Sequence, residues 1–167
     1  MTGVIHVMSK HLVKLPCSIT SEGALEALER ESVHHALVTR GDDLEGVVCR
    51  CDLERARPND PVAHFMRKDY LFVDDQTAAR EAAAMMQRWG IGFLPVIAAS
   101  GELAGVVTRR DLRRTGFLPD RWGVDRCAAC GESHSLEPRC DDLIPVFCRD
   151  CSAPPPGGLY VTLGGGD

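Results

Sequence analysis

Two short stretches of this chain are nearly identical: EGVVCRCDLERA at residues 45–56 and AGVVTRRDLRRT at residues 104–115. Each contains a glycine, two valines, three variable residues and an Asp-Leu pair. A short apolar run favours a strand, and an aspartate is common at the start of a helix. We call this stretch, at residues 45–56 and 104–115, the phrase. Each copy of the phrase predicts a strand that passes directly into a charged helix, and the duplication indicates an internal repeat.

The repeat extends to both sides of the phrase. At an offset of 58 residues, Met8 aligns with Met66, Ala24 with Ala82 and VHHALVTR with IGFLPVIA; one added residue then aligns Gly46 with Gly105 and Asp52 with Asp111. A fixed period of this length indicates that each repeat forms one supersecondary unit. The sequence predicts two copies, at residues 1–58 and 59–118.

Both copies predict the same order of elements. A short apolar strand (12–15 and 70–73) precedes a helix rich in Ala, Leu and Met, with Thr20 or Ser21 as the first N-cap and Thr77 as the second. Two β-rich runs around a Gly/Asp turn then predict a hairpin, and the charged helix closes the unit. The predicted fold class is α/β (α+β), with two β-α-β-β-α units that pack pseudo-symmetrically because one unit alone buries its sheet poorly.

At this level of detail the chain resembles a known family. The order Val-Met, strand, Ala-rich helix, FLPVIA, glycine turn and GVVTRRDL is similar to the cystathionine-β-synthase (CBS) domain, and the two copies resemble a tandem CBS pair, or Bateman module, over residues 1 to 118. The first copy departs from the pattern, with Leu37 in place of Pro95 and Cys49 in place of Thr108.

The second phrase has the chemistry of a nucleotide site. Thr108, Arg109, Arg110 and Asp111 offer a hydroxyl, two cations and a carboxylate near a helix start, where phosphate and ribose can both be bound. The resemblance implies that Thr108 and Asp111, and Asp52 in the first copy, hold the ribose of adenosine ligands in clefts between the repeats. The alternative is that each aspartate only caps its helix.

The cysteines of the first copy point to unequal sites. A thiol is a poor hydrogen-bonding group, so we expect the first copy, with Cys49, to bind a ligand more weakly than the second copy, with Thr108. Cys49 and Cys51 are predicted on the same face of one strand, and small buried hydrophobic side chains are the favoured interpretation over a redox or metal pair.

A different composition begins after residue 118. Five of the eight cysteines in the chain lie within 25 residues, and Cys127-x2-Cys130 and Cys148-x2-Cys151 are separated by seventeen residues. This spacing predicts a four-cysteine zinc ribbon at residues 119–152, because four thiolates satisfy tetrahedral Zn²⁺. Iron in a rubredoxin-like site is the alternative metal. Residues 153–167, rich in Pro and Gly, predict a flexible tail.

The segment CAACGE…LIPVFCRDC resembles the zinc finger of the DksA/TraR family of RNA-polymerase-binding regulators, but the helical hairpin of that family has no counterpart here. Residues 121–152 contain four Arg against six Asp and Glu. An acidic ribbon argues against direct binding of nucleic acid and favours binding to a protein.

Composition narrows the function classes. The chain has 167 residues, 44% of them hydrophobic, and a net charge of −5, which argues against a general polyanion binder. No stretch approaches the roughly 18 apolar residues of a membrane span, and the N-terminus does not resemble a signal peptide, so a cytoplasmic location without membrane attachment is expected. The sequence shows no catalytic triad, P-loop or supported pair of catalytic carboxylates, so no enzymatic activity is expected.

These observations predict a regulatory protein in which the CBS pair binds AMP, ADP, ATP or S-adenosylmethionine and the zinc ribbon binds a protein partner. The resemblance implies a homodimer. Two alternatives stay open: a transcription-machinery or nucleic-acid-associated ribbon protein with the CBS pair as a scaffold, and a metal or redox sensor in which occupancy of the four-cysteine site is the signal.

Overall fold

The computed structural model of the protein describes residues 1–118; the predicted ribbon and tail lie outside them. The chain divides into two compact units. The first-copy unit is His11–Tyr70, and among the described residues the second-copy unit combines Met1–Lys10 with residues 71–118. No helix among the described residues is long and apolar enough to span a bilayer.

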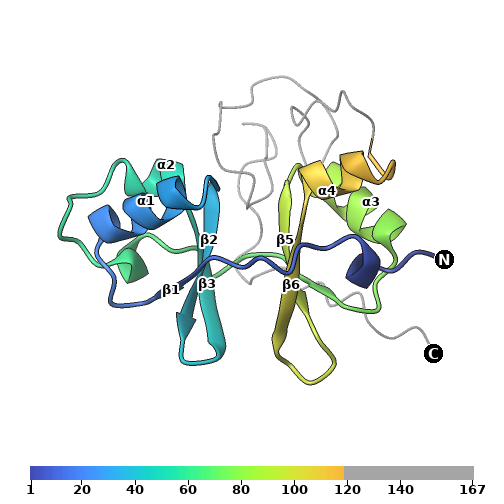
Figure 1. Ribbon diagram of the computed structural model, residues 1–167, viewed down its shortest axis with the longest axis horizontal. Helices are drawn as coiled ribbons and strands as arrows, with labels where there is room; N and C mark the ends of the chain where they lie inside the picture. The colour runs from blue at the N-terminus through green and yellow to red at the C-terminus, as the bar shows by residue number, and fades with distance from the viewer. Residues whose placement is uncertain (119–167) are drawn as a thin grey trace, which may run out of the picture. The chain divides into compact units, whose positions relative to one another are not determined.

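The first-copy unit contains a three-stranded sheet with two helices on one face (Figure 1). Its elements are β1 (Lys14–Pro16), α1 (Ser21–Arg30), β2 (His35–Arg40), β3 (Asp43–Cys49), α2 (Arg50–Leu53) and the short 3₁₀ helix η2 (Val62–His64). The sheet order is β1-β2-β3, with β1 parallel and β3 antiparallel to β2.

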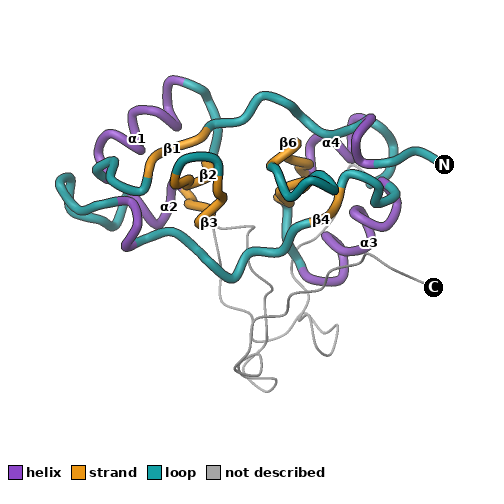
Figure 2. The backbone as a smooth tube through the Cα atoms, turned by 90° about the horizontal axis from the view of Figure 1, so that it is seen from below, coloured by secondary structure: helices purple, strands orange, loops and turns teal. Residues whose placement is uncertain are grey.

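The second-copy unit has the same plan, and both of its helices again cover one face of the sheet (Figure 2). Its elements are the 3₁₀ helix η1 (Val4–His6), β4 (Val73–Asp74), α3 (Ala79–Trp89), β5 (Phe93–Ile97), β6 (Leu103–Thr108) and α4 (Arg109–Arg114). Strand β5 again lies between a parallel and an antiparallel neighbour. The predicted order β-α-β-β-α is confirmed in both copies, whereas the packing of one copy against the other stays a prediction.

The helix N-caps are partly as predicted. Thr20 caps α1, with its hydroxyl accepting from Gly23 N at 3.2 Å. The prediction for Thr77 was wrong, because α3 begins one residue later with Ala78 as N-cap. The carboxylate of Glu81 accepts from Ala78 N at 3.2 Å, while the Thr77 hydroxyl donates to Asp74 at 3.1 Å. A carboxylate inside the first turn thus replaces the expected side-chain cap.

Each unit has its own hydrophobic core between the sheet and the helices. In the first-copy unit the predicted helix stripe is buried at Ala24 and Leu28, beside Val38 and Val48 of the hairpin. In the second-copy unit the stripe of α3 is buried from Ala79 to Met86, and Trp89 packs against its edge. Burial of one helical face explains why the 3.6-residue periodicity was readable in the sequence.

The compact units do not coincide with the sequence repeats. The segment that opens the first copy, around Val4, belongs to the second-copy unit, where Val4 N donates to Thr77 O at 2.8 Å. The equivalent segment of the second copy belongs to the first-copy unit, where Val62 N donates to Ile19 O at 2.8 Å. The copies therefore exchange their opening segments, and Figure 1 shows the first of them, in dark blue, beside α3.

Candidate functional site

The repeated phrase folds in the same way in both units. Strand β3 ends at Cys49 and α2 begins at Arg50, and strand β6 ends at Thr108 and α4 begins at Arg109. Asp52 and Asp111 are consequently the third residues of their helices. The sequence suggested that each helix begins at its aspartate, and this was wrong. The aspartates lie further into the first turn, where a carboxylate can reach back to the N-cap backbone.

In the second copy, Thr108 and Asp111 bind each other in a capping box. Oδ2 of Asp111 accepts from Thr108 N at 2.9 Å and from the Thr108 hydroxyl at 2.7 Å, and that hydroxyl accepts from Asp111 N at 3.3 Å. The capping alternative is therefore observed. It also fixes the rotamer of Asp111, so the carboxylate is held in one orientation.

The second carboxylate oxygen of Asp111 has a different environment. Its nearest charged neighbour is Arg114 Nη2, at 3.8 Å from Oδ1, and the Asp111 side chain is 14% exposed. A carboxylate oxygen has two acceptor positions, so Oδ1 keeps capacity for further donors. The arrangement combines a fixed, largely buried carboxylate with one oxygen still able to accept.

In the first copy the aspartate has another partner. Cys49 is the N-cap residue of α2, and its side chain makes no capping hydrogen bond. Asp52 is instead bound by Arg67, whose Nε and Nη2 donate to Oδ2 and Oδ1, each at 3.3 Å. Because both side chains are partly exposed, 36% for Arg67 and 19% for Asp52, this ion pair contributes less than about 1 kcal/mol to stability.

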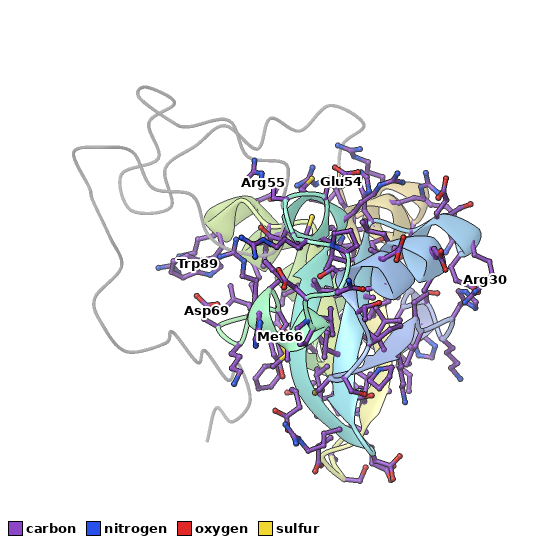
Figure 3. The ribbon with its side chains drawn as sticks, turned by 90° about the vertical axis from the view of Figure 1, so that its left-hand side faces the viewer. Arg30, Glu54, Arg55, Met66, Asp69 and Trp89 are labelled. Atoms are coloured by element: carbon purple, nitrogen blue, oxygen red, sulfur yellow. The ribbon has the colours of Figure 1, made fainter. Side chains whose placement is uncertain are left out.

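The backbone places Arg67 beside Asp52. Arg67 N donates to Val47 O at 2.7 Å and Val47 N donates to Arg67 O at 2.9 Å, which pins the exchanged segment to β3. Met66, the residue before it, is labelled in Figure 3 and packs against the same strand at Gly46. The side chain of Arg67 therefore starts from a fixed point near the first turn of α2.

The second copy has the same backbone pairing with a different side chain. Ser9 N donates to Val106 O at 2.8 Å and Val106 N donates to Ser9 O at 3.0 Å. At the offset of 58 residues, Ser9 is the equivalent of Arg67. The conserved geometry thus presents a short neutral side chain in one copy and a long cation in the other.

The glycine of each phrase is explained by this pairing. A Cβ built on Gly46 would lie 2.7 Å from Arg67 O, and one built on Gly105 would lie 2.8 Å from Ser9 O. Both distances are shorter than real Cβ atoms tolerate, and both involve backbone. Glycine is required at these positions because the exchanged segment passes too close for a side chain.

The remaining predicted residues lie in different settings. Arg109 is half-buried, and its backbone N–H donates to Gly92 O at 2.9 Å, whereas Arg110 is exposed. Cys49 is fully buried, as predicted for a small hydrophobic side chain. Its predicted pairing with Cys51 on one strand face was wrong, because the strand ends at Cys49 and Cys51 lies in α2.

Metal ligation has no candidate within the described part of the chain. Residues 1–118 contain no cluster of three or more His, Cys, Asp or Glu side chains suited to a metal ion. The predicted ligands Cys127, Cys130, Cys148 and Cys151 lie beyond those residues.

Arg67 is the functional candidate that the sequence did not indicate. Its only signal was the mismatch with Ser9 under the repeat alignment.

Several known proteins are similar in sequence to this chain. A CBS domain-containing protein of Dictyostelium discoideum is 29% identical over 126 residues, which cover 65% of this chain and 87% of that protein. An inosine-5'-monophosphate dehydrogenase of Korarchaeum cryptofilum is 33% identical over 100 residues, but these cover only 21% of the enzyme and 57% of this chain.

Among solved structures, the cytosolic domain of the Mg²⁺ channel MgtE in complex with ATP is 28% identical to this chain. The two structures superpose with a TM-score of 0.60, and the match covers 65% of this chain and 46% of the MgtE chain. The family model for the CBS domain matches twice, at residues 4–59 and 62–116. The two copies of the phrase, their β-α-β-β-α units and these two matches show that the chain belongs to the CBS domain family, with two CBS domains in tandem.

Proposed function

We propose that this chain is a non-catalytic regulatory protein whose second CBS copy binds the ribose of an adenosine-containing ligand: AMP, ADP, ATP or S-adenosylmethionine. Asp111 accepts from the ribose hydroxyls, Thr108 holds the carboxylate in place, and Arg109 and Arg110 favour a phosphate. The observation that supports this most directly is the Asp111 carboxylate, which is 14% exposed and has one oxygen fixed by Thr108.

The physical argument is preorganisation. A ribose diol donates two hydrogen bonds, and a charged acceptor makes these stronger than a neutral one does. The capping box removes most of the side-chain entropy that Asp111 would otherwise lose on binding. The relative MgtE was solved with ATP bound to its cytosolic domain, which supports an adenine nucleotide as the ligand class.

Isothermal titration with each of the four ligands tests the proposal. Asp111→Asn retains the size of the side chain and an oxygen able to accept from Thr108 N, so the fold should persist while affinity falls at least tenfold. Asp52→Asn is the matched control at the equivalent position, and it should leave affinity unchanged. No binding of any of the four ligands at millimolar concentration would refute the proposal, as would an equal loss in both variants.

For the C-terminal segment we propose a structural zinc ribbon formed by Cys127, Cys130, Cys148 and Cys151, which presents a surface to a protein partner. The support is the Cys-x2-Cys spacing and the four-thiolate donor set, which suits Zn²⁺. Elemental analysis of purified protein should find one zinc per chain. One iron per chain would replace zinc by the rubredoxin-like alternative, and metal-free protein would remove the ribbon from the proposal.

We also propose that the chain forms a homodimer, as CBS pairs commonly do. Sedimentation equilibrium should give twice the chain mass, with and without ligand. A monomer at micromolar concentration would contradict it.

A further inference from the structure

The first-copy site differs from the second in the group that binds its aspartate. Asp52 and Asp111 occupy the same position in equivalent helices, but only Asp52 is bound through both carboxylate oxygens by an arginine. We infer that Arg67 binds the Asp52 carboxylate and so prevents it from binding a ribose. The chain then has one adenosine site, at Asp111, and one site whose carboxylate is blocked by the chain's own arginine. This inference rests on the ribose-binding role proposed for the phrase.

Charge decides the competition for Asp52. Two guanidinium N–H groups donate to a carboxylate in the parallel geometry that arginine favours, and such charge-assisted bonds are about twice as strong as neutral ones. A ribose offers two neutral hydroxyls to the same two oxygens. The ligand would have to displace a cation that is already in place.

The position of Arg67 favours closure further. Two backbone hydrogen bonds to Val47, at 2.7 and 2.9 Å, fix the main chain from which the side chain extends. A tethered guanidinium competes at a high effective concentration, whereas the ligand pays the entropy of association. The carboxylate is also available to Arg67, because Cys49 offers no hydroxyl to hold it in a capping box.

Two substitutions should give Asp52 the same side-chain neighbours that Asp111 has at the N-cap and on the exchanged segment. Cys49→Thr restores the residue found at Thr108, and Arg67→Ser restores the residue found at Ser9. The experiment is made in full-length protein that also contains Asp111→Asn, so that ligand binding by the second copy is weakened. Titration with ATP, AMP and S-adenosylmethionine then measures the first copy alone.

The combined variant C49T/R67S/D111N should bind at least one of these ligands several-fold more tightly than D111N does. C49T/D111N, which keeps Arg67, should stay as weak as D111N, and adding Asp52→Asn to the combined variant should abolish the gain. Should Arg67→Ser prevent folding, as judged by circular dichroism, Arg67→Met retains the aliphatic stem without the charge and should open the site equally.

The inference is overturned if the folded combined variant gains no affinity, or if C49T/D111N gains as much while Arg67 is still present. Wild-type stoichiometry is an independent measure: one ligand per chain agrees with a closed first copy, and two per chain overturns it. Failure of the proposed function is a separate result, because loss of binding through Asp111 is measured in wild-type protein and the gain through Asp52 in the D111N background.

Discussion

The two copies of the phrase have one backbone and two chemistries. In both, a strand ends at the N-cap, a short helix begins at an arginine, and a leucine one residue after the aspartate enters the core. In the second copy a threonine holds the aspartate from within the phrase; in the first, an arginine holds it from a segment 15 residues further along. The residues that build the unit are thus shared, and the residues that would bind a ligand have diverged.

This difference shows how equivalent positions of a duplicated unit can change their hydrogen bonding without a change of fold. Cys49 ends β3 as a fully buried side chain and makes no capping hydrogen bond. An uncapped carboxylate can then be taken over by Arg67. Substitutions at equivalent positions should separate the shared architecture from the diverged chemistry.

The shared leucine should give the largest and most equal losses. Leu53 and Leu112 are 1% and 0% exposed and belong to the cores of different units. Truncation to alanine at either position should lower the free energy of unfolding by about 2–5 kcal/mol, because it removes buried methyl groups and leaves a cavity. Urea denaturation measures both, and Ile5→Ala, at a 42% exposed position, is the control with little expected loss. A loss below about 1 kcal/mol in one copy would break the architectural equivalence.

The phrase glycines come next. Gly46→Ala and Gly105→Ala each force a Cβ to within 3 Å of a backbone oxygen, so each should destabilise its unit by about 1–3 kcal/mol. Gly3→Ala is the matched control, since a Cβ there would meet its nearest atoms at an ordinary 3.7 Å. Thermal melts would compare the three. Similar midpoints for Gly3→Ala and Gly105→Ala would argue that the exchanged segment does not approach as closely as described.

The capping box should distinguish the copies in a double-mutant cycle. Thr108→Ala removes the hydroxyl, and Asp111→Asn removes the charged acceptor, of the hydrogen bond between the two side chains, so their coupling energy should be about 1 kcal/mol. The equivalent cycle of Cys49→Ala and Asp52→Asn should show coupling near zero, because Cys49 makes no side-chain cap. Chemical denaturation of the four variants and two doubles supplies the measurement. Equal coupling in the two cycles would erase the contrast between the copies.

The smallest effect concerns a residue just beyond the C-terminal end of α1 in one unit and of α3 in the other. Ser32 and Gly90 align at the offset of 58, and both have positive φ, 54° and 68°. Serine pays a steric cost there that glycine does not, so Ser32→Gly should stabilise the protein by roughly 0.5–1 kcal/mol. Gly90→Ser should destabilise it by a similar amount, which makes it the reciprocal control. Destabilisation by Ser32→Gly would contradict this, and a shift in urea midpoint decides the sign.

Local patterns in the sequence were sufficient for most of the fold. The order of strands and helices, the hairpins and the buried stripe of α3 were all predictable, because each depends on the spacing of apolar residues and on turn residues within a few positions. Errors occurred at element ends, as at Thr77 and Cys51. There, a side chain from inside the helix, or an early helix start, decided the boundary.

The candidate site was predictable only within the phrase. Thr108 and Asp111 are three residues apart, so their proximity follows from one turn of helix. Arg67 is 15 residues from Asp52 in the sequence, and no local periodicity indicates that the two meet. Its contact with Asp52 depends on where the exchanged segment pairs with β3, which is a long-range feature.

By itself, the sequence determined that this chain is a duplicated β-α-β-β-α protein with one intact and one altered copy of its phrase, because periodicity and capping chemistry are local properties. Only the tertiary structure decided which segment packs against which copy, why Gly46 and Gly105 cannot have side chains, and what holds Asp52. The physical reason is that backbone pairing between segments far apart in the chain brings Arg67 to Asp52 and Ser9 to the equivalent position, and no short window of residues contains both partners.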